Sequence, residues 1–189
     1  MKLFSLAFAA VLSLASFAGG AFAQSGNTLT IQLKDGPVVI QLMPDVAPKH
    51  VAQIEALAKK GAYDNVAFHR VIEGFMAQTG DVKFGNMEKG FDASRAGTGG
   101  SDLPDLPAEF SKTPFVRGTV GMARSQDPNS ANSQFFIMFA DGSFLNGQYT
   151  VVGKVVSGME NVDKIKRGEG QNGEVSNPDR MIKVTVGSK

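Results

Sequence analysis

Short stretches in which apolar and polar residues alternate recur along the chain after its first 23 residues. The first, Thr28–Leu33, leads into a turn signal at Asp35 and Gly36, and an apolar run follows at residues 38–42, which together predict a β-hairpin. Similar runs predict strands at residues 67–72, 75–79, 119–123, 135–138, 151–156 and 181–186. Many short strands with few helices are typical of a closed antiparallel barrel or a sandwich.

Two stretches have the spacing of helices instead. Apolar residues recur at helical intervals over residues 48–58, with Asp45 as a candidate N-terminal cap and Gly61 as the residue that ends the helix. This helix is expected to cover an apolar surface and to leave His50 in solvent. A second, shorter helix is predicted within residues 158–168.

The first residues have the pattern of an export signal. Lys2 precedes an apolar run over residues 3–18, and a small-x-small site ends at Ala23. This pattern predicts a signal peptide over residues 1–23, cut between Ala23 and Gln24. The apolar run is shorter than the roughly 20 residues of a membrane-spanning helix. We therefore expect a periplasmic or secreted protein that does not insert into the membrane after cleavage, with residues 24–189 forming one domain.

Charge and cysteine content narrow the classes of partner. The whole chain has 19 basic and 18 acidic residues, so it lacks the field that would attract nucleic acid or anionic lipid. It has no cysteine, so its fold does not depend on disulfides. No metal site is expected, because neither histidine has a second histidine nearby in sequence and the chain has no cysteine. A monomer without a cofactor is expected.

Two strings of sequence carry the candidate chemistry. Residues 68–81 place Arg70, several large apolar side chains and Gln78 on two adjoining predicted strands. Residues 118–124 and 132–137 supply a second apolar surface with amide groups beside it. The combination suits a substrate that is apolar and nearly uncharged.

These strings closely resemble the signature of the cyclophilins, the cyclophilin-type peptidyl-prolyl cis-trans isomerases, and the resemblance runs from about Thr28 to Val186. It implies a mainly β fold, a closed eight-stranded antiparallel barrel capped by two α-helices. It also implies that the protein isomerises prolyl bonds in proline-containing polypeptides, and the signal peptide suggests that these are exported proteins in the course of folding.

The chemistry of this reaction needs no nucleophile. Resonance in an X-Pro amide opposes rotation with a barrier of about 18 to 20 kcal/mol. When the bond is twisted, the proline nitrogen loses conjugation and becomes a hydrogen-bond acceptor. A fixed donor aimed at that nitrogen therefore binds the transition state better than either ground state.

The resemblance assigns roles to particular residues. It places the catalytic arginine on Arg70, with Gln78 fixing its orientation, and it places the wall of the proline pocket on Phe75, Met76, Phe136 and Leu145. Strand alternation would put Phe75 and Met76 on opposite faces unless the chain bends at Gly74.

Other matched residues surround this pocket. Ala123 and Arg124 fall where family members use an edge strand to bind the substrate backbone, and Gln134 matches a residue near the substrate. Phe144 stands where cyclosporin-sensitive members carry tryptophan, and Tyr149 where histidine is common, so cyclosporin is expected to bind weakly.

Alternatives remain for each assignment. Arg70 taken alone could be a surface arginine in a salt bridge, and the pocket residues could be ordinary core. His69 is expected to be a packed structural histidine, since it alternates away from Arg70. The whole chain could instead be a chaperone that holds proline-bearing segments with incidental turnover, or a scaffold that recruits a partner through the long loop at residues 82–107.

Overall fold

A strongly curled antiparallel sheet forms the body of the protein, and the computed structural model describes it over residues 27–187. The predicted signal peptide and its cleavage site lie outside the described residues. The elements in chain order are β1 Thr28–Leu33, β2 Gly36–Leu42, α1 Pro48–Lys59, β3 Val66–Ala67, β4 Arg70–Ile72, β5 Met76–Thr79, β6 Thr119–Met122, β7 Phe135–Met138, the 3-10 turn η1 Ser143–Leu145, β8 Val151–Ser157, α2 Met159–Val162, β9 Arg180–Met181 and β10 Lys183–Val186.

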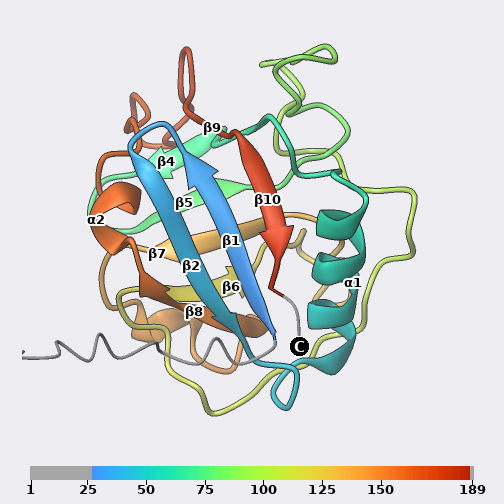
Figure 1. Ribbon diagram of the computed structural model, residues 1–189. Coiled ribbons are helices and arrows are strands. Elements are labelled where there is room, and N and C mark those ends of the chain that lie inside the picture. The colour runs from blue at the N-terminus through green and yellow to red at the C-terminus, as the bar shows by residue number, and fades with distance from the viewer. Residues whose placement is uncertain (1–26, 188–189) are drawn as a thin grey trace, which may run out of the picture.

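Eight strands form the sheet in the order β10-β1-β2-β8-β6-β7-β5-β4. Among the described residues, the edge strands β10 and β4 form no ladder with each other, so the sheet is a half-barrel. A separate two-stranded ladder of β3 and β9 joins the segments that lead into these edges. Figure 1 shows α1 lying beside β10 and α2 beside β2. The prediction of a mainly β fold with eight antiparallel strands and two helices is confirmed, whereas the barrel is open between β10 and β4 and not closed as predicted.

The first hairpin shows why the alternating pattern builds this sheet. Leu29 pairs with Ile40 and Ile31 with Val38, and all four side chains are buried. Apolar residues of α1 cover the same interior, since Val51, Ile54 and Leu57 are buried as predicted. Neither helix among residues 27–187 has the length and apolar content needed to span a bilayer.

Strand β7 is buried on both faces, which a simple alternating strand would not be. Phe135 and Ile137 belong to the interior of the half-barrel, whereas Phe136 and Met138 belong to a second apolar cluster on the opposite face. Successive strand residues point to opposite sides, so one short strand contributes to both clusters. The second cluster is the surface on which the candidate site is built.

The start of α1 differs from the sequence-based expectation. The N-cap is Ala47, and no side chain of the cap residue bonds the first turn, so the assignment of Asp45 as cap is wrong. The Glu109 carboxylate takes that place, because it accepts the backbone N–H groups of Lys49 and His50 at 3.1 Å. It also pairs with His50 Nδ1 at 2.7 Å, and the His50 side chain is fully buried, so the expectation of a solvated histidine is also wrong.

The other boundaries agree with the sequence in part. Gly61 ends α1 as predicted, with φ of +68°, and the N–H of Ala62 bonds the carbonyl of Leu57 in the usual manner of a glycine-terminated helix. The strand predicted over residues 67–72 is split into β3 and β4, and the one over residues 181–186 into β9 and β10. The second helix, α2, is only one turn long.

Candidate active site

Two adjoining hollows lie over β5, β6 and β7 on the face of the second apolar cluster. The first, which we call the apolar hollow, has a volume of about 380 Å³ and is lined by Arg70, Phe75, Met76, Gln78, Ala123, Arg124, Phe136, Phe144, Leu145, Gln148 and Tyr149. The second, the polar hollow, has a volume of about 350 Å³ and is lined by Gln78, Gly97, Thr98, Gly99, Ala123, Arg124, Ser125, Ser130, Asn132, Ser133 and Gln134. Gln78, Ala123 and Arg124 line both, so the two hollows form one groove.

The structure therefore brings the sequence-predicted residues together. All of them line the apolar hollow except Gln134, which lines the polar one. A larger hollow of about 590 Å³ lies between α1 and β10, but no aromatic side chain lines it and it shares no lining residue with the groove. The groove is the better candidate because it combines apolar surface with a few convergent polar groups.

Strand register aligns the central residues of the groove. Arg70 of β4 pairs with Gln78 of β5, Gln78 with Phe136 of β7, and Phe136 with Gly121 of β6. Residues directly opposite on neighbouring strands share one face of the sheet. The arginine, the amide and the pocket phenylalanine thus lie in a row across the strands.

Aromatic rings form the floor of the apolar hollow. Phe136 is buried, and its ring stacks on that of Phe115 with centroids 5.7 Å apart, while Tyr149 meets it edge-on at 5.9 Å. A Cβ on Gly121 would lie 2.5 Å from Phe115 and 2.6 Å from Phe136. Only glycine at that position lets the two rings stack below the groove.

Phe75 and Met76 reach the same hollow because the chain bends before β5. Gly74 has φ of +67°, and the N–H of Phe75 donates to the carbonyl of Ile72 at 3.0 Å, so Phe75 lies in the turn and only Met76 lies in the strand. The bend expected at Gly74 is confirmed. Phe75 contacts Phe144 with ring centroids 5.5 Å apart, and Phe144 is 63% exposed, so these two rings form the rim.

Arg70 is held by neutral groups. Its Nη1 donates to Gln78 Oε1 at 3.2 Å and its Nε to the carbonyl of Asn172 at 2.9 Å. None of the ion pairs found among residues 27–187 includes Arg70, so the reading as a salt-bridged surface arginine does not hold. Partial burial lowers the pKa of Arg70, because desolvation disfavours the charged form.

A chain of amides connects this arginine to the polar hollow. Gln78 Nε2 donates to Gln134 Oε1 at 3.0 Å, and Gln134 Nε2 donates to the carbonyls of Gly97 and Gly99 at 3.0 and 2.7 Å. The long loop thereby meets the strands at a fixed point. Each amide is oriented by the next, so the side chains that line the groove are preorganised.

The carboxylate of Asp81 anchors the backbone of the same loop. Its side chain is fully buried, with Oδ1 accepting N–H groups from Lys83 and Phe84 and Oδ2 accepting those of Gly97 and Gly99, all between 2.8 and 3.1 Å. The loop at residues 82–107 is therefore anchored near its start, at residues 83–84, and again at residues 97–99. Sequence reasoning missed this role, although a carboxylate that opens a glycine-rich loop is a recognisable signal.

Ala123 and Arg124 continue from the end of β6. That strand lies between β8 and β7, so the expectation that these residues belong to an edge strand is wrong. The ladder opens beyond Met122, where the N–H of Ala123 still donates to the carbonyl of Gln134 at 2.9 Å.

His69 is buried behind Gly97 as a packed histidine, and burial lowers its pKa, which keeps it neutral near pH 7.

Similarity to known proteins agrees with this geometry. The family model for cyclophilin type peptidyl-prolyl cis-trans isomerase/CLD matches residues 28–186. A probable peptidyl-prolyl cis-trans isomerase of Brucella suis is 71% identical over 176 residues, which cover 93% of this chain and 90% of that protein. The chain belongs to the cyclophilin family.

More distant peptidyl-prolyl cis-trans isomerases match this chain in sequence or in fold. Peptidyl-prolyl cis-trans isomerase B of Escherichia coli is 37% identical over 146 residues, which cover 73% of this chain and 83% of that one. A Cryptosporidium parvum cyclophilin, crystallised in the presence of the dipeptide Ala-Pro, superposes with a TM-score of 0.72 at 26% identity over 86% of this chain and 99% of its own. The present protein is therefore a peptidyl-prolyl cis-trans isomerase, and its substrates are proline-containing peptides.

Several residues that shape the groove were not predicted. Phe115 supports the floor, Gln148 lines the apolar hollow, and the main chain of Asn172 orients Arg70. Each acts through a contact between segments far apart in sequence or through its backbone.

No group of three or more acidic or histidine side chains suited to a metal ion occurs in residues 27–187.

Proposed function

We propose that the apolar hollow receives the proline ring and that Arg70 donates a hydrogen bond to the proline nitrogen as the amide twists. The observation that carries this proposal is a guanidinium without a carboxylate partner at the edge of an aromatic hollow, fixed by Gln78 and Asn172. A saturated five-membered ring offers little besides apolar area, which the floor of Phe136, Met76 and Leu145 matches.

The fixed position of Arg70 favours the twisted state over the planar ones. A planar amide nitrogen is not an acceptor, so the donor gains its partner only near the top of the barrier. The donor is already oriented by two hydrogen bonds, and partial burial strengthens its field. The crystal structure of a related isomerase in the presence of Ala-Pro supports a proline-containing peptide as the ligand.

We also propose that the substrates are proteins that fold after export. The support is the basic residue, apolar run and small-x-small site of residues 1–23. Exported proteins must isomerise their prolyl bonds outside the cytosol, and the uncatalysed exchange takes tens to hundreds of seconds. An isomerase in the same compartment would remove this delay.

Arg70→Ala tests the catalytic assignment. Its kcat/KM on a proline peptide, measured in a protease-coupled assay, should fall about 100- to 1000-fold, the usual cost of removing one transition-state donor. Arg70→Lys keeps the charge but loses the planar donor pair, so it should restore little. Lys112→Ala, at an exposed position outside the groove, serves as the control. Near-normal turnover by a folded Arg70→Ala protein would remove Arg70 from the mechanism.

A further inference from the structure

The groove has an unbalanced charge. Arg70 and Arg124 line it, and no aspartate, glutamate or lysine does. Three arginines outside the groove have acidic partners, since Arg117 pairs with Asp163 at 2.6 Å, Arg167 with Glu73 at 2.5 Å and Arg180 with Glu88 at 3.6 Å. Within residues 27–187, no ion pair includes Arg70 or Arg124. The groove is thus locally cationic on a chain whose net charge is only +1.

Arg124 holds its charge in a fixed place. Its Nη1 donates to the carbonyls of Ser125 and Gln126 at 2.8 and 3.2 Å, and its Nη2 to that of Gln148 at 2.9 Å. The guanidinium also lies 4.4 Å above the centre of the Tyr149 ring. Neutral carbonyls orient a cation without cancelling its charge, so a carboxylate that arrives need not first order this side chain.

The position of Arg124 decides what it can select. It lines both hollows, so a chain whose proline occupies the apolar hollow passes this guanidinium where it continues into the polar one. We propose that Arg124 selects substrates with an acidic residue beside the isomerised proline, a selectivity that rests on the proposed binding of proline in the apolar hollow. Arg70 contributes charge of the same sign, so a basic residue at that place is disfavoured.

A matched set of peptides measures this selectivity. Two series carry Glu, Gln or Lys, one immediately before the proline and one immediately after it. Glu and Gln have nearly the same shape, so their ratio of kcat/KM reports the charge. We expect Glu above Gln and Gln above Lys in at least one series, with a Glu/Gln ratio of about 1.5 to 5, the range of partly exposed ion pairs. High salt should move that ratio toward 1.

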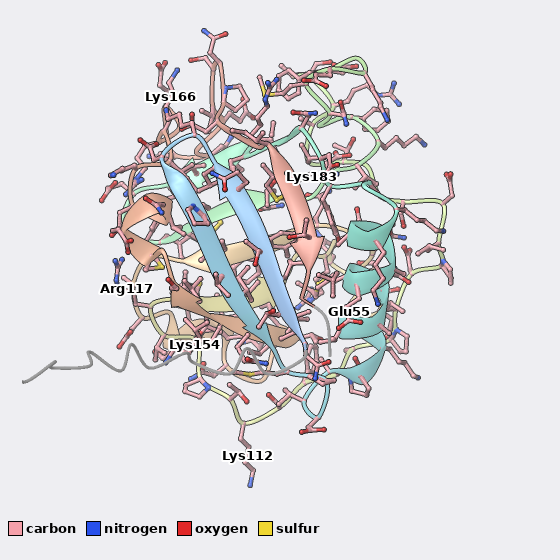
Figure 2. The ribbon with its side chains drawn as sticks, viewed as in Figure 1. Glu55, Lys112, Arg117, Lys154, Lys166 and Lys183 are labelled. Atoms are coloured by element: carbon pink, nitrogen blue, oxygen red, sulfur yellow. The ribbon has the colours of Figure 1, made fainter. Side chains whose placement is uncertain are left out.

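Three variants assign the selectivity to one residue. Arg124→Gln should bring the Glu/Gln ratio to about 1, whereas Arg124→Lys should keep part of it. Lys112→Gln removes the same charge from a side chain that extends away from the ribbon in Figure 2, and it should leave the ratio unchanged.

Two results would overturn the inference: equal turnover of the Glu and Gln peptides by the wild-type protein, or a ratio that Arg124→Gln does not alter. The salt dependence gives a second measurement on the wild-type protein alone, should Arg124→Gln not fold, and a ratio insensitive to salt also counts against the proposal. Failure to turn over any of the peptides would instead contradict the proposed proline site itself.

Discussion

The rim residue Phe144 illustrates how one side chain can tune inhibitor binding without affecting the fold. Its ring is 63% exposed and contacts Phe75, so few buried contacts depend on it. Phenylalanine supplies an apolar wall but no hydrogen-bond donor. The cyclosporin-sensitive relatives carry tryptophan at the matching position, whose indole N–H is such a donor.

Phe144→Trp should therefore tighten inhibition by cyclosporin, which we expect to be weak for the wild-type protein. A net hydrogen bond contributes about 0.5 to 1.5 kcal/mol, so the inhibition constant should fall several-fold. Turnover of a neutral proline peptide should change much less, because the proline ring has no acceptor for that donor. Inhibition titrations of both proteins check this. Strong inhibition of the wild type would show that the sequence match at this turn is misplaced.

The sequence predicted those groove residues that act through their side chains and lie within an uninterrupted stretch of family-like sequence. Arg70, Gln78 and Phe136 were identified from such strings, and strand register then placed them in one row. Phe115 could not be predicted, because its stacking depends on an approach that Gly121 permits between segments far apart. Asn172 could not be predicted either, since it acts through a main-chain carbonyl.

At the scale of elements, α1 begins on a carboxylate supplied from another part of the chain. Local rules favoured Asp45, which lies two residues before the N-cap Ala47 and is exposed. Glu109 satisfies two N–H groups of the first turn, interacts favourably with the positive end of the helix dipole, and pairs with the buried His50. The N–H of Glu109 itself donates to Thr150 Oγ1 at 3.0 Å, which ties this cap to the residue after Tyr149.

Glu109→Ala should lower the free energy of unfolding by about 1 to 3 kcal/mol, because it leaves helix N–H groups and His50 without their partner. Asp45→Ala removes an equal charge near the same helix end and should change stability by less than about 0.5 kcal/mol. Denaturant unfolding of both variants distinguishes the two caps. Equal destabilisation would assign the cap to neither carboxylate.

The same cap implies a dependence on pH. Although burial alone would raise the pKa of Glu109, hydrogen bonds from His50 and Lys49 outweigh it and hold that pKa below the ordinary 4.5. A lowered carboxyl pKa contributes stability that is present above pH 4.5 and is lost as the pH falls through the lowered value. The difference in stability between wild type and Glu109→Ala should therefore shrink in acid below pH 4.5.

At the scale of the molecule, the alternating pattern predicted which segments form the sheet but not their order. Sequential strands β1 and β2 pair through a short turn, whereas β2 pairs with β8 and β6 lies between β8 and β7. These neighbours are distant in sequence, so local periodicity carries no information about them. The predicted strands at residues 67–72 and 181–186 each divide, and their first parts pair with each other as β3 and β9.

The proposed export of the whole molecule predicts a mature chain that begins at Gln24. N-terminal sequencing of the protein from the envelope fraction should find this residue, because signal peptidases cut after a small-x-small site such as the one that ends at Ala23. Ala23→Leu should retain the longer chain, which a shift in mass would report. Soluble wild-type protein that keeps residues 1–23 would contradict the proposal.

The double burial of β7 has a consequence for how this enzyme can diverge. Phe135 and Ile137 pack the interior, while Phe136 and Met138 support the groove. A substitution that shifts the β7 backbone on one face therefore also moves the side chains on the other face. Phe144 lies instead on a short exposed turn, where substitutions disturb little packing. Descendants of this protein are therefore expected to inherit the floor of the pocket unchanged and to acquire new substrate ranges through the turns of its rim.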